Sequence, residues 1–565
     1  MVHIPRMFRW LLLALFVASA SSACAQPAKT APEALPSGGL SEVTLYELLL
    51  AEIALQRGEP ELAAQTYLEV AKRTRDPRVA RRTVEVATSA RLNDLAIEAA
   101  RIWEAMEPSS PQALQISAAL LVADKRVDEA LPYLERLLAA EGVNIESAFL
   151  QINRLLAGNP DKAANLRVVR ALAARHDALP QAHFALAQAA TAADDDESAH
   201  AALRRALALR PDWELAAVLQ AQLLQKRSAG EAARSLAAVL EKYPNAGDVW
   251  MNYARALVLD KRFPEARKQF ETLLASSPGN PDVVYAVGVL AFQLKDFQVA
   301  EANLKRLLGM EHRDPNGVRY LLGQVAEEQK QWPRAIEWYR QIQDGDHALP
   351  ARMRTANALA KQGKVDEARA YLRRVEAGGD SEQVQLIIAE AQLLRDAGRQ
   401  DEAYEVLIQA LEKQPDQPEL LYDIALTAEK LERFDVLEAN LRKLIEVRPD
   451  HAHAFNALGY SLAERNLRLP EARKLIEKAL ELSPQDHFII DSLGWVLYRQ
   501  GDLKGAVREL RRAYSGRPDA EIGAHLGEVL WMMGERGEAD KIWREALESS
   551  PENETVLKTI KRLRK

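Results

Sequence analysis

DSLGWVLYRQGDLKGAVRELRRAYSGRPDA, residues 491–520, and AHLGEVLWMMGERGEADKIWREALESSPEN, residues 524–553, are two copies of one pattern offset by 33 positions (527 minus 494). Each copy has a glycine, then an alanine, then a large apolar residue four positions later, and finally a proline. These are Gly494, Ala506, Leu510 and Pro518 in the first copy, and Gly527, Ala539, Trp543 and Pro551 in the second. The preceding unit repeats the order with Gly459, Ala472, Ile476 and Pro484. A constant period of this length indicates a repeated supersecondary unit.

Each repeated position has a packing reason. The glycine and the alanine lie early in two successive helices, A and B, where the backbones approach too closely for a larger side chain. The large apolar residue fills the groove that remains. The proline lacks an amide donor and disfavours helix at the residue before it, so it ends helix B. Together these positions resemble the tetratricopeptide signature.

The same pattern extends towards the amino end with varying fidelity. Copies of it carry Ala51 and Ala63, Ala118 and Ala130, Ala187 and Ala199, Ala254 and Ala266, Gly288 and Ala300, Gly323 and Ala335, Ala356 and Ala368, and Ala391 and Ala403. The stretches 84–103 and 145–179 keep helical periodicity but lose most signature positions. The resemblance predicts an all-α, right-handed α-solenoid of about fifteen tetratricopeptide-type hairpins, stabilised by stacking of neighbours.

The expected organisation has six parts. Residues 1–23 form a leader, 24–40 a flexible tether rich in Pro, Ala, Gly and Ser, and 41–179 a degenerate set of repeats. Residues 180–451 form a central array, 452–553 the high-fidelity repeats, and 554–565 a cap helix with an apolar face and basic end.

The leader has the form of a secretory signal. Arg6 and Arg9 precede an apolar run too short for a stable membrane span, and small residues follow it. The single cysteine, Cys24, ends the stretch SSAC, which resembles a bacterial lipobox with serine in place of the usual aliphatic residue. Lipidation of Cys24 would anchor the protein to the periplasmic face of the outer membrane. The alternative is cleavage of ACA before Gln26, which would leave a soluble periplasmic protein.

Composition argues against several functional classes. Acidic and basic residues number 81 and 74, giving a formal net charge of -7 and no general attraction to nucleic acid. The chain contains no glycine-rich phosphate loop, nucleophile elbow or zinc-protease motif. His451 and His453 lie two residues apart without a companion ligand, and the acidic run 194–197 falls in an expected turn. We therefore expect no catalytic residue, no cofactor and no metal site.

A partner-binding groove is predicted on the inner face of helix A in three successive repeats. Aromatic side chains in a groove are common anchors of protein recognition, because they bury much area with few rotors. The alternative is that some of these residues pack between adjacent helices. The predicted groove residues are Asn456, Tyr460, Asp491, Trp495, Tyr498, Glu528 and Trp531.

The order of features resembles a proteobacterial family of tetratricopeptide outer-membrane lipoproteins that bind and activate a periplasmic carboxyl-terminal processing protease. The resemblance rests on the leader, on the opening segment 40–87, and on the closing block from HAHAFNALGYSLAERN to HLGEVLWMMGERGEADKIWREAL. It implies a non-catalytic adaptor that presents peptidoglycan hydrolases to the protease and so regulates cell-wall turnover. The catalytic groups would then belong to the partner.

A second function remains as an alternative. Tetratricopeptide arrays also serve as assembly subunits of envelope export or exopolysaccharide machines. A glycosyltransferase fused to repeats would instead need a long stretch of alternating strand and helix, and the sequence has none to spare beside the repeats.

Overall fold

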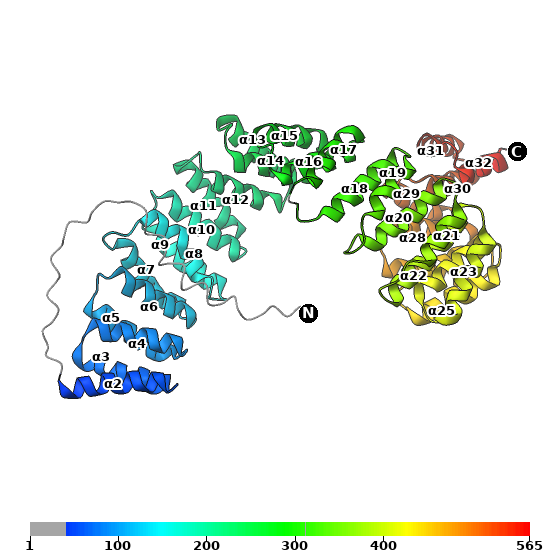
Figure 1. Ribbon diagram of the computed structural model, residues 1–565. Helices are drawn as coiled ribbons and strands as arrows, with labels where there is room; N and C mark the ends of the chain where they lie inside the picture. The colour runs from blue at the N-terminus through cyan, green and yellow to red at the C-terminus, as the bar shows by residue number, and fades with distance from the viewer. Residues whose placement is uncertain (1–40, 311, 565) are drawn as a thin grey trace. The chain divides into compact units, whose positions relative to one another are not determined.

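The computed structural model describes residues 41–310 and 312–564. The predicted leader, residues 1–23, and the predicted tether, residues 24–40, lie outside the described residues, and so does Cys24. Within the described part every regular element is an α-helix (Figure 1). The helices form two compact units that divide at Tyr253 and Ala254, inside α14 (Gly247–Leu259), and each unit is described by itself.

The first unit holds the helices that precede α14. Their bounds are α2 Glu42–Gln56, α3 Pro60–Thr74, α4 Pro77–Ser89, α5 Asn93–Met106, α6 Pro111–Ala123, α7 Val127–Ala139, α8 Ile145–Leu156, α9 Lys162–Ala174, α10 Pro180–Ala192, α11 Asp196–Leu209, α12 Glu214–Gln225 and α13 Ala229–Lys242.

The second unit holds the helices that follow α14. Their bounds are α15 Phe263–Ser276, α16 Pro281–Gln293, α17 Phe297–Leu308, α18 Pro315–Glu328, α19 Trp332–Arg340, α20 Ala348–Lys361, α21 Val365–Arg373, α22 Asp380–Asp396, α23 Gln400–Lys413, α24 Pro418–Lys430, α25 Phe434–Val447, α26 Ala452–Glu464, α27 Leu469–Leu482, α28 His487–Arg499, α29 Leu503–Gly516, α30 Ala520–Met532, α31 Arg536–Ser549 and α32 Glu554–Leu563.

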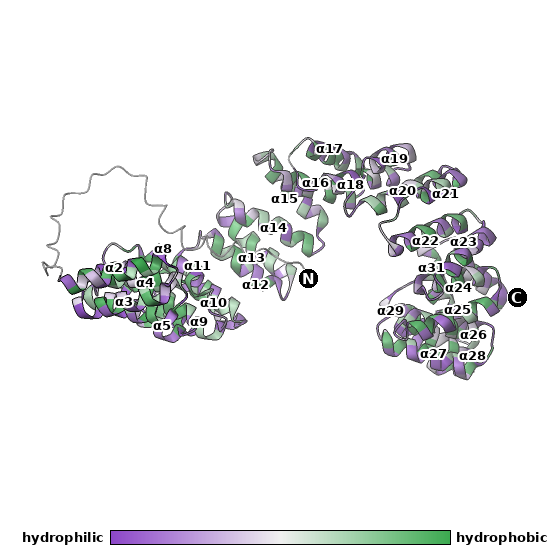
Figure 2. Ribbon diagram, turned by 60° about the horizontal axis from the view of Figure 1, so that its bottom comes forward, coloured by the Kyte–Doolittle hydropathy of each residue, from purple (hydrophilic) through white to green (hydrophobic). Residues whose placement is uncertain are grey.

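Successive helices pair as hairpins. In the described residues, α2 to α31 give fifteen A and B pairs, and α32 follows as a single helix. Most helices carry hydrophobic and hydrophilic residues together (Figure 2), and the hydrophobic residues pack between neighbouring helices. The predicted all-α array of about fifteen tetratricopeptide-type hairpins with a final helix is confirmed.

The signature glycines lie where two helices meet most closely. A Cβ atom added to Gly494 would lie 2.6 Å from Leu510 Cγ and 3.2 Å from the carbonyl oxygen of Ala506. A Cβ added to Gly459 would lie 2.8 Å from the carbonyl oxygen of Ala472. The packing reason inferred from the sequence therefore holds in these hairpins.

The turn inside a hairpin uses a left-handed residue after helix A. Thirteen of the fifteen described hairpins have one, and in eight of them it is not a glycine: Arg91, Lys125, Asp194, Lys261, Lys295, Lys330, Glu432 and Asn466. The two exceptions are the turns of α8–α9 and α12–α13. The first of these belongs to the stretch 145–179, where the sequence loses its signature, and there α8 packs against α10 more than against α9.

The acidic run 194–197 begins in the expected turn, but its last two residues belong to α11. Asp194 adopts the left-handed conformation, and α11 begins at Asp196. The carboxylate of Asp195 accepts a hydrogen bond from the amide of Ser198 at 3.0 Å, and Asp196 pairs with Lys226 at 2.8 Å. These acids therefore cap a helix and pair with nearby bases.

The last helix, α32, covers the end of the preceding hairpins. Its residue Val556 is fully buried, and α32 packs mainly on α30. Arg562 of α32 forms an ion pair with Glu528 of α30. Among the described residues, no helix has the length and apolar character needed to cross a bilayer.

Candidate partner-binding surface

The predicted groove residues lie on three A helices, α26, α28 and α30, in the second unit. Four of them are half-buried and retain exposed atoms: Asn456, Tyr460, Tyr498 and Trp531. The other three are buried: Asp491, Trp495 and Glu528. The seven residues therefore differ in whether they can touch a partner.

An aspartate–histidine pair joins α28 to α30 at the centre of this surface. Asp491 accepts hydrogen bonds from His525 Nδ1, at 2.9 Å to Oδ2 and 3.1 Å to Oδ1, and both residues are buried. The Trp495 ring stacks on the imidazole with centroids 4.2 Å apart and planes inclined by 25°. The Tyr460 hydroxyl on α26 lies 3.4 Å from His525 Nε2. One imidazole thus links its own helix, α30, to the two preceding A helices, α26 and α28.

Two carboxylates fix the aromatic side chains around that pair. Trp495 donates its indole N–H to Glu464 Oε2 at 2.7 Å, which ties α28 to α26. Tyr498 donates its hydroxyl to Glu528 Oε1 at 3.2 Å, which ties α28 to α30. Since Arg562 pairs with the same Glu528, the last helix joins the network. We call this set, namely Tyr460, Glu464, Asp491, Trp495, Tyr498, His525, Glu528 and Arg562, the inner cluster.

Electrostatics favour the protonated form of His525. Burial disfavours the imidazolium, but the Asp491 carboxylate outweighs it, so the pKa of His525 is raised above its usual 6.5. Burial also raises the pKa of the Tyr460 phenol, so it stays protonated. The aspartate–histidine pair therefore ends on the half-buried, protonated phenol of Tyr460, and the three side chains join neighbouring repeats.

The binding role of the groove remains a prediction. The buried positions of Trp495, Asp491 and Glu528 agree with the alternative that some predicted residues pack between helices. Tyr460, Tyr498 and Trp531 keep the exposed edges that a partner needs. Trp531 packs beside Trp543 with centroids 5.6 Å apart, and the Arg536 guanidinium lies 5.0 Å from its ring centroid.

Sequence reasoning missed His525 and Glu464. Asp491 and His525 are 34 residues apart, one more than the repeat offset of 33. This separation places an acid and a base at nearly equivalent positions of neighbouring A helices, and their pairing could have been predicted from it. Glu464 ends α26, at a position where a charged residue is ordinarily solvated.

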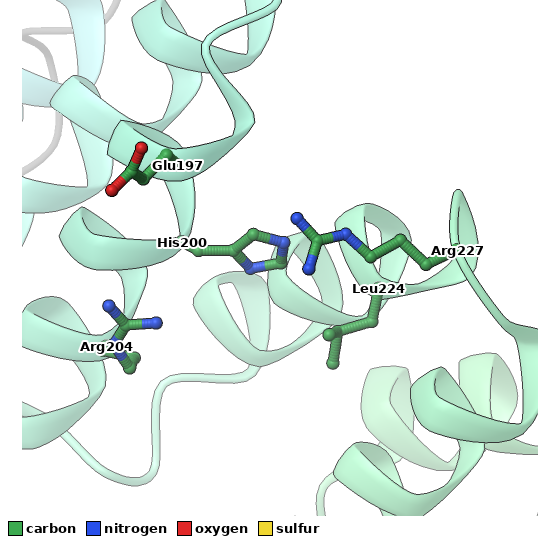
Figure 3. A pocket seen from close by; sticks show the side chains of 5 residues that line it. All are labelled: Glu197, His200, Arg204, Leu224 and Arg227. Atoms are coloured by element: carbon green, nitrogen blue, oxygen red, sulfur yellow. The ribbon is translucent and has the colours of Figure 1, made fainter.

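A second feature that the sequence did not indicate is a hollow of about 370 Å³ in the first unit. Figure 3 shows its lining, Glu197, His200 and Arg204 from α11, with Leu224 at the end of α12 and Arg227 just after it. His200 and Arg227 extend towards one another across it. The carboxylate of Glu197 shares this lining with the two arginines, the hollow is open, and both arginines are exposed.

Comparison with known protein families identifies the repeat. The tetratricopeptide repeat profiles match residues 223–290, residues 285–350, 388–436 and 422–487, and residues 351–377. These matches cover the middle of the chain and reach α27, where the sequence signature is strong.

Individual proteins are similar over spans of different length. The chain is 34% identical over 508 residues to "TPR repeat-containing protein PA4667" of Pseudomonas aeruginosa, covering 87% of this chain and 83% of that protein. Among solved structures, yeast Tom70 is 13% identical with a TM-score of 0.35, over 93% of this chain and 96% of that one. The thermophilic TPR protein TTC0263 of Thermus thermophilus is 25% identical with a TM-score of 0.29, over 32% and 97%.

Proposed function

Because this chain belongs to the family of tetratricopeptide repeat proteins, we propose that it is a scaffold that presents peptidoglycan hydrolases to a periplasmic carboxyl-terminal processing protease. The observation that supports a scaffold is the unbroken succession of hairpins from α2 to α31 in the described residues. Such arrays offer extended surfaces for other polypeptides. The choice of protease and hydrolases rests on the resemblance of segments 40–87 and 451–547 to the lipoprotein family.

The proposed mechanism is an increase in effective concentration. The scaffold holds the protease on one surface and a hydrolase on another, which makes their encounter intramolecular and raises its frequency without a new catalytic group. Lipidation at Cys24 would confine the assembly to the periplasmic face of the outer membrane, with residues 24–40 as its tether. Without lipidation the same assembly would be soluble in the periplasm.

The exposed edges of the inner cluster and of Trp531 are the proposed contact points. Tyr498 and Trp531 present aromatic area on successive A helices. Tyr498 is fixed by its hydrogen bond to Glu528, and Trp531 by its tilted ring contact with Trp543. A rigid aromatic side chain loses little conformational entropy on binding, so it is an efficient anchor.

Affinity capture from the periplasm tests the proposal. The chain from Gln26 onward should retain a carboxyl-terminal processing protease together with at least one peptidoglycan hydrolase, identified by mass spectrometry. Trp531→Ala should reduce recovery of one of them at least tenfold. Tyr514→Ala, which removes a half-buried aromatic side chain from helix B of the neighbouring hairpin, serves as the control and should leave recovery unchanged. Recovery of neither enzyme class would refute the adaptor role.

A further inference from the structure

The first helix of the described residues, α2, carries an exposed apolar stripe. Its large hydrophobic residues point to solvent along the whole helix: Val43, Leu45, Tyr46, Leu49, Leu50 and Ile53. The acids beside the stripe are held by their own hairpin or its neighbour, since Glu47 pairs with Arg73 and Glu52 pairs with Arg82. An apolar patch of this extent on a soluble protein marks an interaction site.

The stripe is the face by which repeats stack. Counting from the small residue of helix A, Tyr46, Leu50 and Ile53 hold the same positions relative to Ala51 that Ile522, Leu526 and Val529 hold relative to Gly527. In α30 these three are 0%, 1% and 0% exposed, because the preceding hairpins cover them. In α2 the three are 67%, 36% and 46% exposed. End repeats ordinarily carry a polar outer face, and α2 does not.

We propose that this stripe binds the same stripe of a second copy of the chain, with the two α2 helices antiparallel about a twofold axis. The axis passes between Leu49 and Leu50, so that Leu49 meets Leu50 of the other copy and Tyr46 meets its Ile53. The spacing of Tyr46, Leu49 and Ile53, three then four residues, is the spacing of a seam between two packed helices. A stripe that is complementary to itself is what a twofold interface requires.

Charge favours the antiparallel arrangement. Glu42 begins α2 and Arg57 follows its end; both are exposed, and neither forms an ion pair within the described residues. In the antiparallel pair each Glu42 lies beside Arg57 of the other copy, whereas a parallel pair would place like charges together. Two such faces bury on the order of 1,000 Å² in total, the size at which specific dimers begin.

Sedimentation equilibrium of the chain from Gln26 onward, which keeps every described helix, tests the proposal. The expected result is a monomer–dimer equilibrium with a micromolar dissociation constant. Leu49→Glu should weaken dimerisation at least a hundredfold, because it buries a charge against Leu50 of the other copy. Leu259→Glu is the matched control, since Leu49 and Leu259 are both 54% exposed, and it should leave dimerisation unchanged. Circular dichroism of both variants checks that the helices persist.

Charge reversal tests the orientation. Glu42→Arg and Arg57→Glu should each weaken the dimer about tenfold by placing like charges together at both ends, and the double reversal should restore it. A monomer at every concentration would overturn the proposal, and so would a dimer insensitive to Leu49→Glu. Flotation of the monomer with phospholipid vesicles, lost in Leu49→Glu, would overturn it in favour of a lipid surface. None of these results bears on whether the chain captures a protease.

Discussion

Replacing Gly494 by alanine should destabilise the protein, although alanine is the better helix former. The new Cβ would lie 2.6 Å from Leu510 Cγ and 3.2 Å from the carbonyl oxygen of Ala506, while carbon atoms in contact stay about 3.5–4 Å apart. Leu510 must therefore move by roughly 1 Å within a packed interface, which costs about 1–3 kcal/mol. The gain in helix propensity offsets about 0.5–1 kcal/mol of that. We expect a net loss of about 1–2 kcal/mol.

Gly537 in α31 is the control for the same chemical change. No atom lies within 4 Å of the position that its Cβ would take, so Gly537→Ala should stabilise the protein by up to about 1 kcal/mol. The opposite signs of the two changes in unfolding free energy separate the effect of close helix packing from the effect of helix propensity. Urea unfolding followed by far-ultraviolet circular dichroism measures both variants, and hydrogen exchange in α28 and α29 locates the effect.

A double-mutant cycle identifies the contact that is responsible. Leu510→Ala alone should cost about 2–5 kcal/mol, because it opens a cavity. In the double variant, the methyl group of Gly494→Ala enters the space that the Leu510 side chain vacates. The double variant should therefore lose less stability than the sum of the two single variants, by about 1 kcal/mol or more. Additivity within about 0.5 kcal/mol, or equal effects of Gly494→Ala and Gly537→Ala, would refute the close-packing explanation.

The other predictions concern the inner cluster and the leader. Trp495→Ala should lower the free energy of unfolding by about 3–5 kcal/mol, because it removes a buried ring and leaves its carboxylate partner unpaired; an unchanged urea midpoint would show that the ring does not pack as described. Because the folded pKa of His525 is raised, its pairing with Asp491 stabilises the fold fully below about pH 6.5 and loses this effect as pH rises through the folded pKa. Asp491→Asn should flatten that decline in thermal unfolding, and an identical decline would contradict the assignment. Cys24→Ser should move the protein from the membrane fraction to the soluble fraction if Cys24 is lipidated; unchanged fractionation would exclude this anchor.

The repeat was predictable because its constraints are local and recurrent. A glycine or alanine where backbones touch and a proline after helix B recur at one offset, and the structure places Gly494 against Leu510 as that pattern requires. Hairpins that lack the signature, such as α8–α9, were predicted only as helical. Their pairing depends on which neighbour offers the better apolar surface, and helical periodicity does not carry that information.

The fate of individual side chains was harder to predict. The helical register places Trp495 and Tyr498 on one face of α28. It does not reveal that His525 of the next repeat covers Trp495, while an edge of Tyr498 stays exposed. The apolar character of α2 was likewise visible in the sequence. Its exposure was not, because exposure depends on a neighbour that periodicity does not reveal.

The order of contacts has a consequence for folding kinetics. The main packing partners of each helix lie one or two helices away along the chain, so few contacts close long loops. Chains with such local contacts fold quickly, and folding can begin at any hairpin and spread to its neighbours. The amino-terminal hairpins can complete their packing while the carboxyl-terminal residues are still unfolded. Folding of the amino-terminal hairpins can therefore proceed while the rest of the chain is still emerging.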